Sequence, residues 1–188
     1  MLCQFSFSNF KSYRNETTFD FQAANLPEFS NSLIRFEKTN ELLPVGVIYG
    51  PNGGGKTNLL QALACLISTV VRPILSLETT RTNIILHQTV DCVPFLLDDT
   101  SKNKPTEFLI YFHTAENEFQ YYLSLLNDEI VSESLSRKKI GGKKPAHIFD
   151  RERDSITLGS SINKRSINTA VNAKMPFLSF LAHGWTFR

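Results

Sequence analysis

The chain has 188 residues and a mass of 21.3 kDa, a length that corresponds to one domain, or to one domain and part of a second. Hydrophobic residues make up 41% of the chain and charged residues 20%, which is typical of a folded globular protein and excludes a disordered one. The 20 basic and 18 acidic residues leave a formal net charge of +2, so the chain is not a polycation that acts by bulk charge neutralisation.

Three cysteines, Cys3, Cys65 and Cys92, lie far apart in the sequence and form no C-x-x-C pair. This odd number indicates neither a disulfide framework nor a zinc site and fits a reducing compartment, so we expect a cytoplasmic protein. No basic segment followed by an apolar core marks a signal peptide at the start. The most apolar stretch, Leu59–Val71, contains polar residues and is shorter than the roughly 20 residues that span a bilayer, so no membrane partner is expected.

The N-terminal region alternates between apolar and polar residues in two short segments. Leu2–Phe7 and Thr17–Phe21 show the period of two that is typical of strands, and a polar turn containing Lys11 separates them. We therefore expect an antiparallel hairpin, followed by a loop over residues 22–43. The apolar run Leu43–Tyr49 has no alternation, which predicts a strand covered on both faces.

Helical spacing of apolar residues predicts a helix over Thr57–Val71, and Pro73 is expected to end it. The second half of the chain changes to short alternating segments separated by turn residues, which indicates an antiparallel meander. Its strands are expected at Cys92–Leu97, Glu107–Phe112, Glu118–Leu126, Glu129–Leu135, His147–Arg151 and Ser155–Leu158. The last 25 residues are expected to be helical, with Pro176 at the start or break before Phe177–Ala182.

One motif carries chemistry, because the residues between the predicted buried strand and the helix fit G-x-x-x-x-G-K-[ST], the phosphate loop. Glycines let the backbone turn tightly, so that successive N–H groups face one centre at the positive end of the helix dipole. A lysine adds a mobile positive charge for the β- and γ-phosphates, and a threonine hydroxyl can ligate Mg²⁺. The matching residues are Gly50, Pro51, Asn52, Gly53, Gly54, Gly55, Lys56 and Thr57.

Two common classes of phosphate-loop protein fit poorly. A Ras-like GTPase needs an N-K-x-D base reader, and the nearest string, residues 163–166, reads N-K-R-S and lacks the aspartate. A small nucleotide kinase usually opens with its phosphate loop, whereas about fifty residues and a hairpin precede the loop here.

The segment Phe5–Phe21 and the loop, which continues as N-L-L-Q-A from Asn58, resemble the N-terminal part of ABC-type ATPases of the SMC, RecF and OLD group. Later segments are similar to bacterial proteins described as AAA family or abortive-infection ATPases. The resemblance implies an α/β P-loop NTPase lobe, with a mixed sheet around the strand ending at Tyr49 and an antiparallel β subdomain. The expected divisions are 1–72 (hairpin, loop strand and helix), 92–160 (β subdomain) and 161–188 (helical start of the next segment).

The same resemblance implies ATP and Mg²⁺ as ligands, with Lys56 and Thr57 in catalytic roles and Asn58 beside the nucleotide. It also places Lys11 near the phosphates, although a solvent-exposed turn lysine is an equal alternative. Gln88 is a candidate metal- and water-sensing residue, but an ordinary polar residue is the better interpretation.

Members of that group also carry a Walker B strand ending in Asp-Glu and an LSGGQ-like signature, and no LSxG string occurs in this chain. Two strings imitate Walker B, Phe95–Asp99 and Leu125–Glu129. Pro94 would interrupt the first strand and Asn127 breaks the second, so acidic turn residues are the favoured interpretation of both. We therefore expect the N-terminal lobe of a longer ATPase that hydrolyses ATP as a homodimer, through a missing C-terminal lobe.

The expected partners are ATP and, by resemblance, DNA or a nuclease or other effector, in DNA maintenance or phage defence. Five basic residues within Arg137–Lys144 fit a nucleic-acid contact, but a solvated hairpin tip explains them more simply. Two other functions stay open. One is a nucleotide-binding interaction module without turnover, and the other is a small phosphotransferase that uses one of the aspartate pairs.

Overall fold

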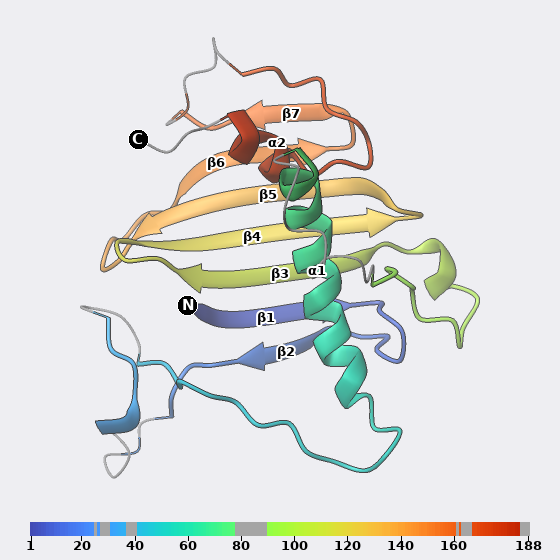
Figure 1. The fold of residues 1–188 in the computed structure, drawn as a ribbon, viewed down its shortest axis with the longest axis vertical. Coiled ribbons are helices and arrows are strands. Elements are labelled where there is room, and N and C mark those ends of the chain that lie inside the picture. Colours follow the sequence, from blue (N-terminus) through green and yellow to red (C-terminus); the bar gives the residue numbers. More distant parts are fainter. Residues whose placement is uncertain are drawn as a thin grey trace.

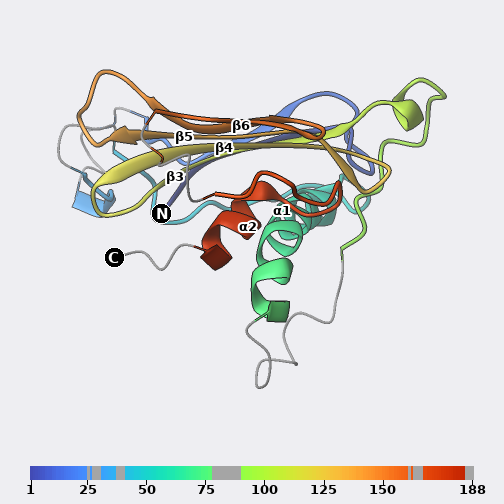
Figure 2. The ribbon, with the colours of Figure 1, turned by 90° about the horizontal axis from the view of Figure 1, so that it is seen from above.

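A computed structural model describes residues 1–24, 26, 31–36, 41–77, 90–160, 162 and 167–184. In these residues one antiparallel sheet has the strand order β2-β1-β3-β4-β5-β6-β7, and both helices cover the same face of it (Figures 1 and 2). The strands are β1 Leu2–Ser8, β2 Thr17–Asp20, β3 Thr106–His113, β4 Asn117–Leu126, β5 Glu129–Lys139, β6 Ala146–Glu152 and β7 Ser155–Leu158. The helices are α1 Lys56–Leu77 and α2 Phe177–Gly184.

The predicted N-terminal hairpin is confirmed, and it extends the meander rather than forming a separate layer. Phe5 of β1 lies opposite Phe19 of β2 on one side and opposite Ile110 of β3 on the other. Because β1 pairs with β3, two segments that are about a hundred residues apart in the sequence lie side by side. The sheet is antiparallel throughout, so the expected mixed sheet around a strand ending at Tyr49 is not formed.

Five of the six strands expected after residue 90 are confirmed, and β5 is longer than expected because alternation continues to Lys139. The expected strand Cys92–Leu97 is wrong. Pro94 has no N–H for a strand ladder, and the N–H of Phe95 instead donates to Asn9 Oδ1 at 3.0 Å. Leu96 and Leu97 are 54% and 85% exposed, so the end of this segment has no buried face to hold in a sheet.

α1 lies across the sheet, and one of its faces is buried against the aromatic core. Lys56–Ile74 is long and apolar enough to cross a membrane by length and composition alone, yet its inner face packs on the strands.

The helix begins one residue earlier than expected and continues to Leu77, so the expectation that Pro73 ends it is wrong. The Ser179 hydroxyl of α2 donates to the Val70 carbonyl at 2.6 Å, which supports the turns around the proline from outside the helix. The buried residues of the inner face are Leu59, Ala62, Cys65 and Leu66.

The segment Leu43–Tyr49, expected as a strand covered on both faces, is also corrected. Only its first residue makes a backbone hydrogen bond among the described residues, from the Leu43 N–H to the Phe21 carbonyl at 2.7 Å. In Figure 1 the segment belongs to the cyan stretch that runs past the β2 edge before α1 begins. Ile48 packs against the core, but Val45, Val47 and Tyr49 are 68%, 77% and 90% exposed. The apolar run was correctly identified, but the part of the chain that the structure describes supplies no neighbouring strands to pair with it.

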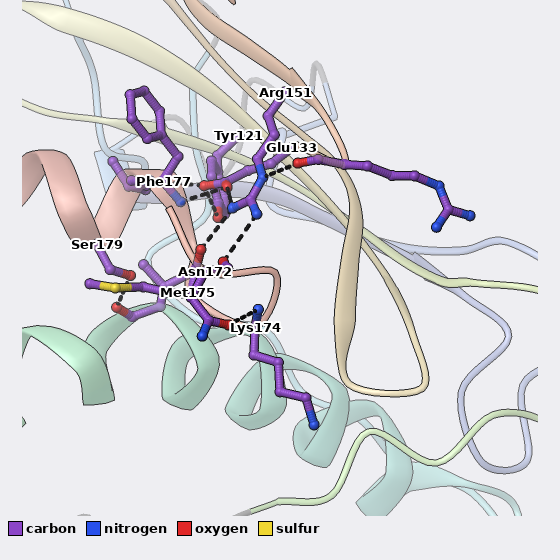
Figure 3. Close-up of polar contacts among 11 residues, drawn as sticks. Tyr121, Glu133, Arg151, Asn172, Lys174, Met175, Phe177 and Ser179 are labelled. Carbon is purple, nitrogen blue, oxygen red and sulfur yellow. Dashed lines mark hydrogen bonds and ion pairs between the residues drawn. The ribbon is translucent and has the colours of Figure 1, made fainter. Parts of the chain in front are cut away.

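The C-terminal segment, expected to be helical over its last 25 residues, is irregular over 167–176 before α2 starts at Phe177. Glu133 of β5 caps this helix from inside the sheet. One carboxylate oxygen accepts the Phe177 N–H at 2.7 Å, and the other accepts the Leu178 N–H and the Tyr121 hydroxyl, each at 2.9 Å (Figure 3). A carboxylate at this position complements the positive end of the helix dipole.

Arg151 of β6 completes this buried cluster beside Glu133, with 3.7 Å between Nη1 and the carboxylate. Its guanidinium donates to the carbonyls of Asn172 at 3.1 Å and Met175 at 2.7 Å, and to the Arg153 carbonyl at 2.7 Å (Figure 3). Both charged side chains are fully inaccessible. Removing both charges from water is costly, and this cost is offset by their mutual attraction and by the hydrogen bonds that engage nearly every polar atom of the pair.

Candidate functional site

The glycine loop, defined here as Gly50–Thr57, leads directly into the first turn of α1. Gly53 and Gly55 have φ angles of +81° and +83°, in the left-handed region that disfavours residues with a Cβ. The Gly54 N–H donates to the Pro51 carbonyl at 3.1 Å and closes a tight turn between them. Gly55, a fixed glycine of the motif, and Gly53, at one of its variable positions, are therefore the residues at which this backbone needs glycine.

The Lys56 ammonium is folded back over its own loop. Its Nζ donates to the carbonyl oxygens of Gly50 at 2.8 Å and Pro51 at 2.7 Å. An ammonium has three N–H donors, so one remains for another acceptor. No hydrogen bond within the described residues engages the N–H groups of Gly53 or Gly55. The loop thus presents unpaired donors and a positive charge at the start of a helix, as an anion site requires.

The hairpin turn, defined as residues 9–15 between β1 and β2, packs against the loop and the start of α1. The Tyr13 hydroxyl donates to the Gly55 carbonyl at 3.3 Å, and Asn58 Nδ2 donates to Ser12 Oγ at 2.8 Å. A Cβ at Gly55 would lie only 3.1 Å from the Tyr13 hydroxyl oxygen and 3.2 Å from Ser12 Oγ. This contact is a second reason for glycine at position 55, besides its φ angle.

Lys11 lies in the same turn, but its ammonium donates to Gln61 Oε1 of α1 at 2.7 Å rather than to the loop. Its N–H donates to the Val93 carbonyl at 2.9 Å, which links the turn to the segment before β3. The contacts of Ser12 and Tyr13 with the loop were not predicted, although both residues lie in the segment that carries the family resemblance. Their proximity to Lys11 in the turn was the available signal.

The two acidic strings have structural roles, as the favoured interpretation expected. Asp98 accepts hydrogen bonds from the Thr100 hydroxyl at 2.7 Å and the Ser101 N–H at 2.6 Å, and it pairs with Arg14 Nε at 2.8 Å. These hydrogen bonds, with the Arg14 charge, hold the pKa of the Asp98 carboxyl well below its usual range. Asp128 lies with Asn127 in the tight turn between β4 and β5, where both have positive φ angles.

We expect Asp98→Asn to weaken the dependence of stability on acid pH. A carboxyl whose pKa is lowered by folding stabilises the protein above its unfolded pKa, near 4, and loses this contribution as the pH falls through the folded pKa. Urea unfolding at pH 6 and pH 3 should therefore show a smaller loss of stability in Asp98→Asn than in the wild type. Asp99→Asn, whose nearly fully exposed side chain pairs with Lys102, is the matched control and should keep the wild-type loss. Equal losses in all three proteins would contradict the assigned role of Asp98.

Other candidate ligands add little to the site. The residues that the structure describes contain no cluster of three or more His, Cys, Asp or Glu side chains that could hold a metal ion. Thr57 is exposed at the end of the loop, and Gln88 lies outside the described residues. The donor set of the loop is therefore suited to an anion, and a cation would have to arrive with that anion.

The basic segment Arg137–Lys144 lies at the β5–β6 end of the sheet. Lys138 pairs with Glu118 at 2.8 Å, while Lys143 and Lys144 are exposed in the turn. This arrangement fits the interpretation as a solvated hairpin tip.

Comparison with protein families places the loop in a known context. Residues 46–184 match the family described as "AAA domain, putative AbiEii toxin, Type IV TA system". The chain belongs to this family. A comparison with curated proteins finds no match. As an AAA domain, the chain is a P-loop nucleotide-binding ATPase in class, and such ATPases generally use ATP with Mg²⁺. The family match confirms the expected fold class, a P-loop NTPase. The expected mixed sheet is not found, because every strand pair in the described residues is antiparallel.

Proposed function

We propose that the glycine loop binds the triphosphate of Mg²⁺-ATP. The observation that carries this proposal is the combination of unpaired loop N–H groups with the Lys56 ammonium, which retains one free donor at the start of α1. Backbone N–H groups within Asn52–Thr57, among them the unpaired ones of Gly53 and Gly55, would cradle the phosphates. Lys56 would move from the Gly50 and Pro51 carbonyls toward the β- and γ-phosphates. The exposed Thr57 hydroxyl would hold Mg²⁺, which neutralises phosphate charge when bound.

The hairpin turn would set the position of the loop. Tyr13 holds the Gly55 carbonyl, and Ser12 holds the Asn58 side chain, so the loop is fixed from outside by a turn of the sheet. The side chains of Asn58 and Lys11 would then lie next to the bound nucleotide but outside the glycine loop that holds its phosphates. Lys11 would need to leave Gln61 before it could contact phosphate.

We further propose the finer grouping with ABC-type ATPases of the SMC, RecF and OLD kind, in which hydrolysis takes place in a homodimer. An apolar surface beside the loop supports this proposal. On the outer face of α1, Leu60 and Ile67 are 59% and 48% exposed, and Val47 and Tyr49 are exposed just before the loop. A helix that is apolar on most sides is typical of a buried helix, so we propose that a second lobe carrying the Walker B and signature residues covers this surface.

A second candidate function is nucleotide binding without turnover. It is favoured by the hydrogen bonds of Asp98 to the Thr100 hydroxyl and the Ser101 N–H and by its ion pair with Arg14, because this carboxylate is then not free to position an attacking water. Asp128 lies in the hairpin turn between β4 and β5. The phosphotransferase alternative needs one of these carboxylates and is the least supported of the three.

Nucleotide titration and phosphate release on the same protein distinguish these candidates. Binding of Mg²⁺-ATP by calorimetry, with negligible phosphate release, is the result expected for this chain alone. Release that depends on Asp98 or Asp128 would instead support a self-contained enzyme and contradict the two-lobe proposal. Absence of binding by the folded chain would contradict the loop assignment itself.

We also propose a cytoplasmic role in phage defence or DNA maintenance. The family description, which names a toxin of a type IV toxin–antitoxin system, supports defence as the first of these. Expression of the chain together with its genomic neighbours during phage challenge would test this role.

A further inference from the structure

One face of the sheet is covered by neither helix. Figure 2 shows α1 and α2 on the same side of the strands, and we call the opposite side the outer face. The register of the strands decides which side chains point to it. Phe7 and Phe108 are paired and belong to the core under the helices, so their neighbours Ser8 and Glu107 point to the outer face. An antiparallel sheet can leave such a face to water.

The outer face carries mostly negative charge. Among its strand positions, Lys138 is the one lysine or arginine, and its ammonium pairs with Glu118 at 2.8 Å. The chain as a whole has a formal net charge of +2, so the acidic character belongs to this face and not to the protein in general. The carboxylates at the outer positions of the strands are Asp20, Glu107, Glu118, Asp150 and Glu152.

Two hydroxyl groups orient the carboxylate of Glu107 near the middle of this face. The Ser8 hydroxyl donates to one of its oxygens at 3.0 Å, and the Tyr122 hydroxyl donates to the other at 2.8 Å. Burial and the Glu107 carboxylate raise the pKa of Tyr122 to about 12, so this hydroxyl remains a donor at neutral pH. Each carboxylate oxygen keeps lone-pair capacity for a further donor.

Glu107 has no positively charged partner among the described residues. It lines a small cleft of about 150 Å³, whose wall also carries Leu109 and a second carboxylate, Glu16. A carboxylate whose two oxygens are both held in place matches a guanidinium, which donates two parallel N–H bonds from one plane. An ammonium would supply only a point charge at the same position.

We propose that the outer face of the sheet docks an arginine-rich segment of another protein, with one guanidinium bound to Glu107. The remaining positive charges of the segment would lie over the carboxylates on either side, Asp20 toward the β2 edge and Asp150 on β6. Charge complementarity carries this proposal, because the face offers carboxylates with little positive charge among them. The same charge repels a phosphate backbone, so a nucleic acid is excluded as the occupant of this face.

The test is fluorescence anisotropy of a labelled nona-arginine peptide with the folded chain in the absence of nucleotide. We expect binding that weakens as salt is added, and weaker binding of nona-lysine. Glu107→Gln should weaken binding of the arginine peptide about 10-fold, because it removes a hydrogen-bonded charge pair. Asp150→Asn, which changes a half-exposed carboxylate of β6, should weaken it about 2- to 5-fold.

Asp99→Asn is the matched control, because Asp99 is an exposed carboxylate in the loop before β3, outside the outer face, and this variant should bind as the wild type does. Urea unfolding of each variant shows whether it is folded. The proposal is overturned if the peptide does not bind, or if folded Glu107→Gln and Asp99→Asn bind equally well. It is also overturned if a DNA duplex displaces the peptide by binding this face, as mapped by amide chemical shifts. Association of the chain with itself that Glu107→Gln abolishes would show that the occupant is a second copy. None of these measurements depends on the nucleotide-binding function proposed above.

Discussion

Replacing Lys56 with alanine is expected to weaken Mg²⁺-ATP binding about 10- to 150-fold. The substitution removes the ammonium that lies over the Gly50 and Pro51 carbonyls, and with it a hydrogen bond from a charged donor to phosphate. Such a bond contributes about 1.5–3 kcal/mol, and each 1.4 kcal/mol corresponds to a tenfold change in affinity. Isothermal titration calorimetry with Mg²⁺-ATP measures the effect directly.

Lys102→Ala is the matched control, because Lys102 is a half-exposed lysine that pairs with Asp99 away from the loop. It should bind nucleotide as the wild type does. Lys56→Arg tests charge separately from shape, because arginine keeps the charge but cannot place a compact ammonium in the loop. Wild-type affinity in Lys56→Ala, with a normal unfolding curve, would refute the assignment of the loop.

Replacing Glu133 with alanine is expected to destabilise the fold by about 3–5 kcal/mol. The substitution leaves the Arg151 guanidinium buried without its carboxylate, and it removes the acceptor of the Phe177 and Leu178 N–H groups. For a chain of this size the melting temperature should fall by roughly 6–20 °C. Urea denaturation and calorimetry provide the two measurements.

Two variants show whether the effect comes from the buried pair. Glu152→Ala removes an exposed carboxylate of β6 that accepts a hydrogen bond from Ser132, and it should change stability by less than about 0.5 kcal/mol. The double substitution Glu133→Leu with Arg151→Met removes both charges and should be more stable than Glu133→Ala alone. Equal destabilisation by Glu133→Ala and Glu152→Ala would contradict the role assigned to the cluster.

Local pattern predicted most of the sheet. The period of two in Leu2–Phe7 and in the strands of the meander identifies strands with one buried face. Successive side chains of such a strand point alternately to the core and to solvent, so apolar and polar residues alternate. The same reasoning failed at Leu43–Tyr49, since an uninterrupted apolar run specifies burial on both faces but does not specify what buries it. It also failed at Pro73, where α2 supports a helix that local propensity would have ended.

The candidate site, too, could be predicted from the sequence only in part. The glycine loop could be predicted because its geometry depends on glycine φ angles and on the helix that follows, all within eight residues. Its contacts with Ser12 and Tyr13 could not, because they require the hairpin turn to pack against a helix more than forty positions later. The Glu133–Arg151 pair was missed for the same reason, since each residue lies in an ordinary alternating strand.

The exposed segment before the loop has a practical consequence for work with the purified chain. Val45, Val47 and Tyr49 project from an extended backbone, and in the described residues no backbone hydrogen bond engages positions 44–49. An extended apolar segment with unsatisfied N–H and C=O groups is a template for intermolecular strand pairing, and so for precipitation on storage. A single charged residue here, on the side facing solvent, is the economical way to keep concentrated samples in solution.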